Sequence, residues 1–218
     1  MYKRRVHELD DPSAVRRLIE EHPWALLLAH GEKGLVASHL PCLLDPTEDG
    51  VDLDDLVILT HVAKGDPIVS CLGSGDETLL VFQGPHGYVS PSWYGEGPHV
   101  GTWNFTAAHV YGVPELLVGD DGFHVLELTQ QRFESRVDRP VELADISDYA
   151  HKIAKATVPF RLRATRVEGK AKLSRDKSDA VQQRVVEALN TPGPYEDPFL
   201  AEDMRRAQSE AGDGRDRS

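Results

Sequence analysis

Two apolar runs separated by a short turn place the strongest constraint on the fold. The run WALLLAH (24–30) is followed by GEKG (31–34) and then by LVASHLPCLL (35–44). Apolar runs on either side of a glycine-containing break are typical of a β-hairpin. The sequence therefore predicts antiparallel β-structure early in the chain.

Further apolar patterns predict four more strands, with helices between them. The strands are expected at 56–62, 78–84, 104–118 and 159–169. Helices are expected after Asp11-Pro12, just after Lys64, at 124–135, at 146–157 and from Ser178. The Pro-, Gly- and Ser-rich stretch 84–98 is expected to be a loop. The pattern favours a mainly β fold with peripheral helices, an antiparallel β-barrel.

The length and the end of the chain bound the domain organisation. A chain of 218 residues is of a size that often forms one domain, and we expect a single domain over 1–200. From Ala201 the chain is polar, with too few apolar residues to order itself, so 201–218 is predicted to be a disordered tail.

Charge and cysteine content restrict the partners and the compartment. The net charge of −12 repels nucleic acid and anionic membrane at long range. No apolar stretch reaches the roughly 20 residues of a membrane helix, and no apolar run follows the first basic residues as in a signal peptide. Cys42 and Cys71 lack CxxC spacing, which indicates two core thiols in a reducing cytoplasm.

The junction between the third strand and the following helix could bind an anion. His61 and Lys64 precede the Asp66-Pro67 helix start, where backbone N–H groups are unpaired. An ordinary capped helix with a surface lysine explains the same residues.

A second basic segment lies within 161–177, where Lys170, Lys172 and Ser174 alternate and could reach an anion. The other interpretation is a charged, exposed strand.

Motifs for several other kinds of site are missing. The ten histidines show no HExxH or HxH pattern, so no metal site is predicted. GxSxG, Walker A and GxGxxG patterns are also missing, and no catalytic residue can be assigned.

A dense aromatic segment runs from Phe82 to Gly112 in a chain otherwise poor in aromatic residues. Its rings, with polar neighbours Gln83, Ser92 and Asn104, suit a planar heterocyclic ligand. Taken singly, each aromatic residue is equally explained as part of a core or a dimer interface.

Five blocks, in this order, resemble one family, the PaiB-type FMN-binding negative transcriptional regulators. The blocks are ASHLPCLLD (37–45), THVAKGDP (60–67), FQGPHGYVSPSWY (82–94), TWNFTAAHVYG (102–112) and VEGKAKLSRDKS (167–178). The resemblance implies an FMN-binding split β-barrel that works as a homodimer, with FMN at the subunit interface.

The resemblance also implies a set of cofactor-binding residues. Ser38 and His39 would lie on the strand along the flavin ring, His61 and Lys64 at the phosphate, and Gln83 at the ring edge. The ring pocket would be formed by Ser92, Trp93, Trp103 and Asn104. Lys172 and Ser174 would close the site. The chain departs from the family pattern at Gly65, Asp66, Gly101 and Arg175. Asp66 adds a negative charge near any phosphate, and Lys64 keeps a charge without bidentate geometry.

Three functions follow from these observations. The family label suggests a flavin-binding regulator, although the net charge disfavours direct DNA contact and only the basic stripe within 161–177 offers a positive face. An FMN-dependent oxidoreductase of the flavin-reductase type is the alternative, with the flavin supplying the chemistry. A barrel that has lost its cofactor and acts as an interaction protein is the third.

Overall fold

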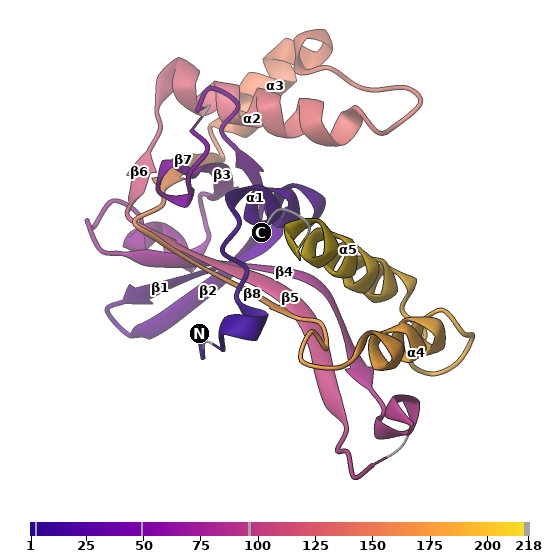
Figure 1. Ribbon diagram of the computed structural model, residues 1–218. Helices are drawn as coiled ribbons and strands as arrows, with labels where there is room; N and C mark the ends of the chain where they lie inside the picture. Colours follow the sequence, from indigo (N-terminus) through magenta and orange to yellow (C-terminus); the bar gives the residue numbers. More distant parts are fainter. Residues whose placement is uncertain (3, 49, 96, 216–218) are drawn as a thin grey trace. The chain divides into compact units, whose positions relative to one another are not determined.

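The computed structural model describes residues 1–2, 4–48, 50–95 and 97–215 (Figure 1). The strands of this part of the chain are β1 (Trp24–Gly31), β2 (Gly34–Leu44), β3 (Val57–Ala63), β4 (Thr78–Val89), β5 (Thr102–Gly112), β6 (Pro114–Leu116), β7 (Thr157–Arg163) and β8 (Arg166–Lys172). The α-helices are α1 (Pro12–Glu21), α2 (Gly119–Glu134), α3 (Ser147–Ala154), α4 (Asp179–Leu189) and α5 (Pro198–Arg215). Short 3₁₀ segments are η1 (Arg5–His7), η2 (Leu53–Asp55), η3 (Pro67–Cys71), η4 (Pro91–Tyr94) and η5 (Leu143–Ile146). No helix in the described residues is both long and apolar enough to cross a membrane.

The strands are hydrogen-bonded in the order β6-β7-β3-β2-β1-β4-β5-β8. The pairs β1–β2, β1–β4, β2–β3, β3–β7 and β6–β7 are antiparallel. The predicted hairpin is present as β1 and β2, which pair from Trp24↔Pro41 to Gly31↔Gly34. Gly34 has φ +113°, a conformation that glycine adopts without strain at such a turn. The expected class, an antiparallel β fold with peripheral helices, is confirmed.

Contacts divide the chain into two compact units. The segments 1–10, 83–107 and 169–218 make up unit 1, and 11–82 with 108–168 make up unit 2. Strands β4, β5 and β8 each run from one unit into the other along the chain. The single domain expected from the sequence stays a prediction.

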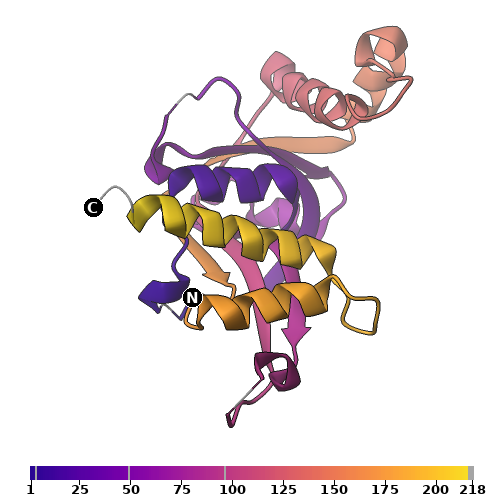
Figure 2. The ribbon, with the colours of Figure 1, turned by 45° about the vertical axis from the view of Figure 1, so that its right-hand side comes forward.

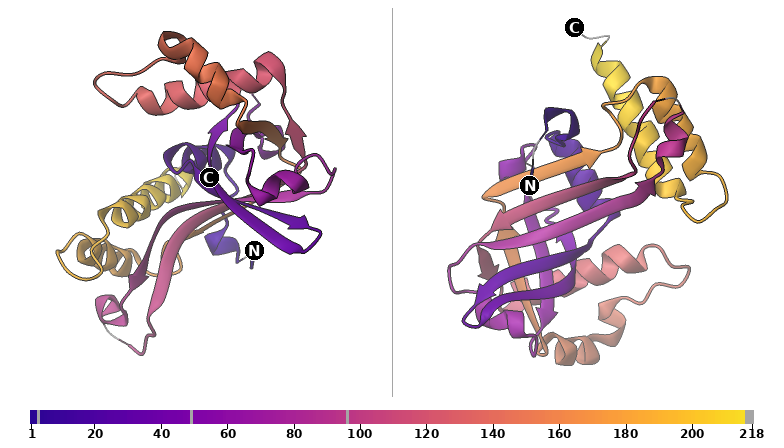
Figure 3. Two further views of the ribbon diagram at one scale, coloured as in Figure 1. Left: turned by 180° about the vertical axis from the view of Figure 1, so that it is seen from behind. Right: turned by 90° about the horizontal axis from the view of Figure 1, so that it is seen from below.

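Unit 2 is built around β1, β2, β3 and β7. Inward-facing side chains of these strands, among them Leu27, Ile58 and Phe160, are fully buried. Helix α1 packs on β2, helix α2 on β3 and β7, and helix α3 on β7. Figure 3 shows α2 and α3 next to each other. Asp11 caps α1 by accepting the Ser13 N–H at 3.0 Å, as its Asp-Pro signal predicts.

Unit 1 is held together by α4 and α5, which lie side by side (Figure 2). Its buried cluster joins Val89 from β4, Leu173 from the segment after β8, Val185 and Leu189 from α4 and Leu200 from α5. These residues come from two distant parts of the sequence, and most of them lie on or near the C-terminal helices, so this core depends on those helices.

The expected loop at 84–98 is wrong over its first part, because β4 continues to Val89. The pairing of β4 with β1 covers Leu79 to Val81. The later part of β4 therefore donates no backbone N–H to β1 in this pairing, and Pro85, which has no N–H, is tolerated there. Gly87 is closely packed there. A Cβ at this position would lie 3.0 Å from the Leu200 side chain.

The disordered tail predicted from Ala201 is also wrong, because residues 198–215 form α5. Leu200, Ala201 and Met204 are buried, and the Leu200 N–H donates to Asp197 Oδ1 at 2.9 Å. The helix buries one narrow stripe, which the low average hydrophobicity of the segment conceals. The last predicted tail residues, 216–218, lie outside the described residues.

Two predicted strands are divided in the structure. The stretch 104–118 forms β5 and β6, which are separated at Val113, and 159–169 contributes to β7 and β8, which are separated at Ala164 and Thr165. The Thr165 N–H donates to the Tyr111 carbonyl at 2.8 Å, which stabilises the break within unit 2. Alternation continues through both breaks in the sequence, so periodicity alone does not reveal them.

Candidate functional site

Ser38 and His39 are neighbours on β2 and face opposite sides of the sheet. Ser38 is buried, and its hydroxyl donates to Asp66 Oδ1 at 2.6 Å. His39 is exposed and stacks on Trp24, with ring centroids 6.2 Å apart. Of these two residues, His39 is the one placed to meet a ligand.

The expected helix after Lys64 is the five-residue 3₁₀ segment η3. Asp66 caps it, since Asp66 Oδ1 accepts both the Ile68 N–H at 2.9 Å and the Ser38 hydroxyl. The backbone donor that a phosphate would use is therefore taken by the protein's own carboxylate. The Lys64 ammonium is exposed, while its backbone N–H donates to the Ala156 carbonyl at 2.8 Å. Lys64 supplies the positive charge at this point.

His61 lies near the end of β3 and is half-buried. Its Nδ1 is buried and has no hydrogen-bond partner among the described residues. Burial lowers the pKa of the imidazole, so the neutral form is favoured. A buried polar atom without a partner is costly unless something binds it, which makes His61 a candidate for ligand contact.

The face of the sheet that carries His39 is mostly apolar. Leu26 on β1 is opposite His39 on β2 and opposite Val81 on β4, and Leu28 is opposite Ala37. Leu26, Leu28 and Val81 are only partly buried. By strand alternation, His61 lies on the corresponding side of β3. Unit 2 thus brings two histidines and an apolar surface to one face of the sheet.

In unit 1, Asn104 and Ser174 form a buried polar pair. Asn104 Nδ2 donates to Ser174 Oγ at 3.0 Å and also lies 3.5 Å from Met204 Sδ. Ser174 has φ +59°, a left-handed conformation rare for a residue with a side chain. The geometry gives both residues a structural role; contact with a cofactor stays a prediction.

Lys172 and Trp103 are joined by a hydrogen bond in unit 1. The Lys172 ammonium donates to the Trp103 carbonyl at 2.7 Å and to the Thr102 hydroxyl. Burial is the main cause that lowers the pKa of Lys172. The Trp103 indole is 54% exposed and meets Tyr88 edge-on, with ring centroids 6.4 Å apart. The ring is thus open to a ligand, whereas the lysine is already engaged.

The remaining predicted residues lie on and beyond β4. Gln83 is exposed on β4, and Ser92 is exposed in η4, where its hydroxyl lies 2.8 Å from that of Ser90. Trp93, also in η4, lines a pocket with residues of the α4–α5 loop. Sequence reasoning missed this pocket, because its far wall comes from residues 188–196, which carry no motif.

Two departures from the family pattern have local explanations. At Gly101, the Tyr88 hydroxyl occupies the place of a side chain, so a larger residue there would require Tyr88 to move. Asp66 is engaged with Ser38 and Ile68, as described above.

The comparisons with known proteins agree with these observations. The family model described as "Putative FMN-binding domain" matches residues 1–166. The protease synthase and sporulation protein PAI 2 of Bacillus subtilis is 26% identical over 212 residues, covering 95% of this chain and all of that protein.

Solved structures share the fold at low identity. A FAD- and heme-binding protein of Mycobacterium smegmatis is 15% identical with a TM-score of 0.57, covering 80% of this chain and 78% of that chain. The flavocytochrome Anf3 of Azotobacter vinelandii is 14% identical with a TM-score of 0.54, covering 89% and 73%. The split-barrel fold implied by the sequence motifs is confirmed. The chain belongs to the family of the "Putative FMN-binding domain", whose cofactor is FMN.

Proposed function

We propose that unit 2 binds FMN through the face of its sheet that carries His39 and His61, and that the protein acts as a homodimeric, cytoplasmic regulator of the PaiB type. The observation that carries the proposal is the buried Nδ1 of His61, which has no hydrogen-bond partner among the described residues, three positions before the exposed Lys64. A phosphate would accept hydrogen bonds from both side chains. The apolar residues around Leu26 would cover the planar ring.

The residues of this face therefore fit FMN. FMN supplies redox chemistry when it is bound, and the protein positions and shields it. Lys64 would hold the phosphate charge. His39, already stacked on Trp24, would present its imidazole to the ring.

The homodimer is supported by the same face of unit 2. Trp24 is 62% exposed and Leu35 79% exposed, and Leu26, Leu28 and Val81 beside them remain partly open to solvent. An apolar sheet face of this kind is typical of an interaction surface. A second copy of the chain would cover it and enclose FMN between the subunits.

Direct contact with DNA is disfavoured by the ion pairs of the basic stripe. Arg161 forms a two-point ion pair with Glu115, at 2.8 and 2.9 Å. Arg163 binds Glu48 at 2.5 Å and Arg166 binds Glu168 at 2.8 Å. With a net charge of −12, this leaves little free positive charge for phosphates. We therefore propose that regulation works through a protein partner or through the flavin state.

The test is a visible absorption spectrum of the purified protein before and after adding FMN, with gel filtration alongside. Flavin bands that stay with a dimer peak through gel filtration are expected. A protein that does not retain FMN would overturn the cofactor assignment, and a monomer that retains FMN would overturn the dimer alone. A gel-shift series at stated salt concentrations tests the regulatory part, with no shift expected at 150 mM salt, about physiological ionic strength.

A further inference from the structure

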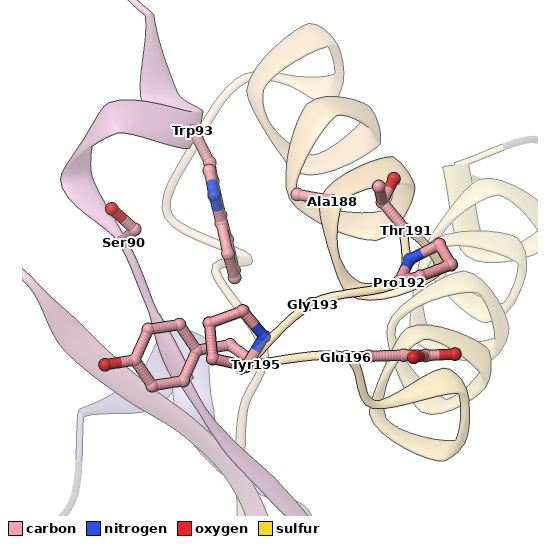
Figure 4. Close-up of a pocket in the computed structure, with 9 residues that line it drawn as sticks. Ser90, Trp93, Ala188, Thr191, Pro192, Gly193, Tyr195 and Glu196 are labelled. Atoms are coloured by element: carbon pink, nitrogen blue, oxygen red, sulfur yellow. The ribbon is translucent and has the colours of Figure 1, made fainter.

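A pocket of about 410 Å³ lies within unit 1, between η4 and the loop that joins α4 to α5 (Figure 4). This volume falls within the range of small-molecule sites. Most of its lining residues come from 188–196, beyond residue 166, where the family match ends. Ser90 and Trp93 lie within the matched segment, and the other lining residues lie beyond it.

Two aromatic rings form one end of this pocket. Trp93 projects from η4 toward the loop, and Tyr195 projects from the loop beside it (Figure 4). Tyr195 is 50% exposed and also contacts Tyr88, with ring centroids 5.0 Å apart. Together, Trp93 and Tyr195 offer flat surfaces to the apolar body of a ligand.

The pocket is formed before any ligand arrives. Arg184 donates to the carbonyl oxygens of Trp93 and Tyr94, at 3.3 and 2.5 Å, and so fixes η4 on α4. At the other wall, the Asp197 N–H donates to the Leu189 carbonyl at 2.8 Å and closes the loop. Such preorganisation lowers the entropy lost on binding.

The charge of the lining selects the kind of ligand. Among the nine lining residues, Glu196 carries the only charge. Its carboxylate points toward α5, away from the Tyr195 ring (Figure 4). The net charge of −12 also raises the local concentration of cations. A ligand that fills the pocket would have an apolar end and a positive end.

We propose that this pocket binds a small primary amine with an aromatic or alkyl body. The body lies against Trp93 and Tyr195, and the ammonium group lies at the Glu196 carboxylate. This site is independent of the FMN site proposed for unit 2.

The indole N–H signals in a ¹⁵N-resolved NMR titration test the proposal. The chain has three tryptophans, Trp24, Trp93 and Trp103, so two of them serve as internal controls. The probes are phenethylammonium, its neutral analogue 2-phenylethanol and its acidic analogue 3-phenylpropionate. The expected result is a saturable shift of the Trp93 signal that is strongest with the ammonium, weaker with the alcohol and weakest with the acid.

Variants separate the two parts of the pocket. Glu196→Gln should weaken the ammonium about threefold and leave the alcohol unchanged, since an exposed carboxylate contributes modestly. Tyr195→Ala should weaken both. Glu202→Gln, on the exposed part of α5, is the matched control and should change neither.

Three results would overturn the proposal. They are a Trp93 signal that does not move with the amine, equal affinity for ammonium and alcohol in the wild type, and a Trp93 signal that responds to FMN but to none of the three probes. Tyr195 and Glu196 are exposed loop residues, so their variants keep the fold even if Trp93 itself cannot be replaced.

Discussion

Asn104 and Ser174 exchange hydrogen bonds in both directions, with Asn104 Nδ2 donating to Ser174 Oγ at 3.0 Å and Ser174 Oγ donating to Asn104 Oδ1 at 3.3 Å. The residues are 70 positions apart in the sequence. This pair keeps Ser174 in its left-handed conformation and ties β5 to the segment that precedes α4. Because both residues are buried, the pair stabilises unit 1 without solvent competition.

Replacing Asn104 by Ala should destabilise the protein by about 2 kcal/mol, because the buried Ser174 hydroxyl loses its partner. Urea unfolding followed by tryptophan fluorescence measures the change. Gln183→Ala, at an exposed position of α4, is the control and should stay within about 0.5 kcal/mol of the wild type. Equal effects of the two substitutions would contradict a structural role for the pair.

Leu200→Ala should reduce the free energy of unfolding by about 3 kcal/mol, because it leaves a cavity in the core of unit 1. The adjacent residue gives a matched control. Phe199 is 77% exposed, and Phe199→Ala should change stability little. If the two variants unfold at the same urea concentration, α5 does not pack as described.

Lys64→Ala should weaken FMN about tenfold, because a charge-assisted hydrogen bond to phosphate is lost. Fluorescence quenching of FMN reports the affinity. Lys33→Ala, an exposed lysine of the β1–β2 turn, is the control. Unchanged affinity in the Lys64 variant would remove this lysine from the cofactor site.

Stability should fall as the pH drops below about 6.5, the ordinary pKa of histidine. Burial lowers the pKa of His61 in the folded state, so the unfolded chain binds the proton first. The stabilising effect is complete above pH 6.5 and is lost as the pH falls through the folded-state pKa. Burial also lowers the pKa of His7 and His109, which add to the effect.

His61→Gln should therefore reduce the stability lost between about pH 7.5 and about pH 5.5. Urea unfolding at the two pH values measures it. His30→Gln, on an exposed position of β1, is the comparison and should keep the full pH dependence. If both variants lose the same free energy of unfolding between the two pH values, His61 has the same pKa in the folded and the unfolded chain.

Trp24→Glu should dissociate the proposed dimer, because it places a charge in the apolar face of unit 2. Val51→Glu, at a residue that is 80% exposed and outside the strands, should leave the dimer intact. Gel filtration over a range of protein concentrations distinguishes them. A dimer that survives the Trp24 substitution would place the interface elsewhere.

Local patterns predicted the β fold and its hairpin, because side-chain alternation and turn residues act over a few positions. They also predicted α1, from its Asp-Pro cap signal and apolar stripe, and α4, from its apolar stripe. The sequence also predicted the strand–helix junction at Asp66, but it did not predict what the Asp66 carboxylate binds. Asp66 turns its carboxylate to Ser38, which is 28 positions away, and no local pattern carries that information.

The tail shows how composition can mislead. Asp197-Pro198 repeats the cap signal of Asp11-Pro12, which was available in the sequence. The polar average of the following residues conceals that signal. Only the packing of Leu200 and Met204 against α4 and β8 residues, which is a tertiary effect, decides the outcome.

The order in which the chain leaves the ribosome determines when unit 1 can fold. Its first ten residues emerge first, yet Leu9 donates to the Gly169 carbonyl and Glu8 accepts from Arg175. The core also needs Met204, so unit 1 cannot close until residue 204 has been synthesised. Contacts between such distant positions slow folding. The N-terminal segment must therefore wait, exposed to proteases and chaperones, for the helices that complete its unit.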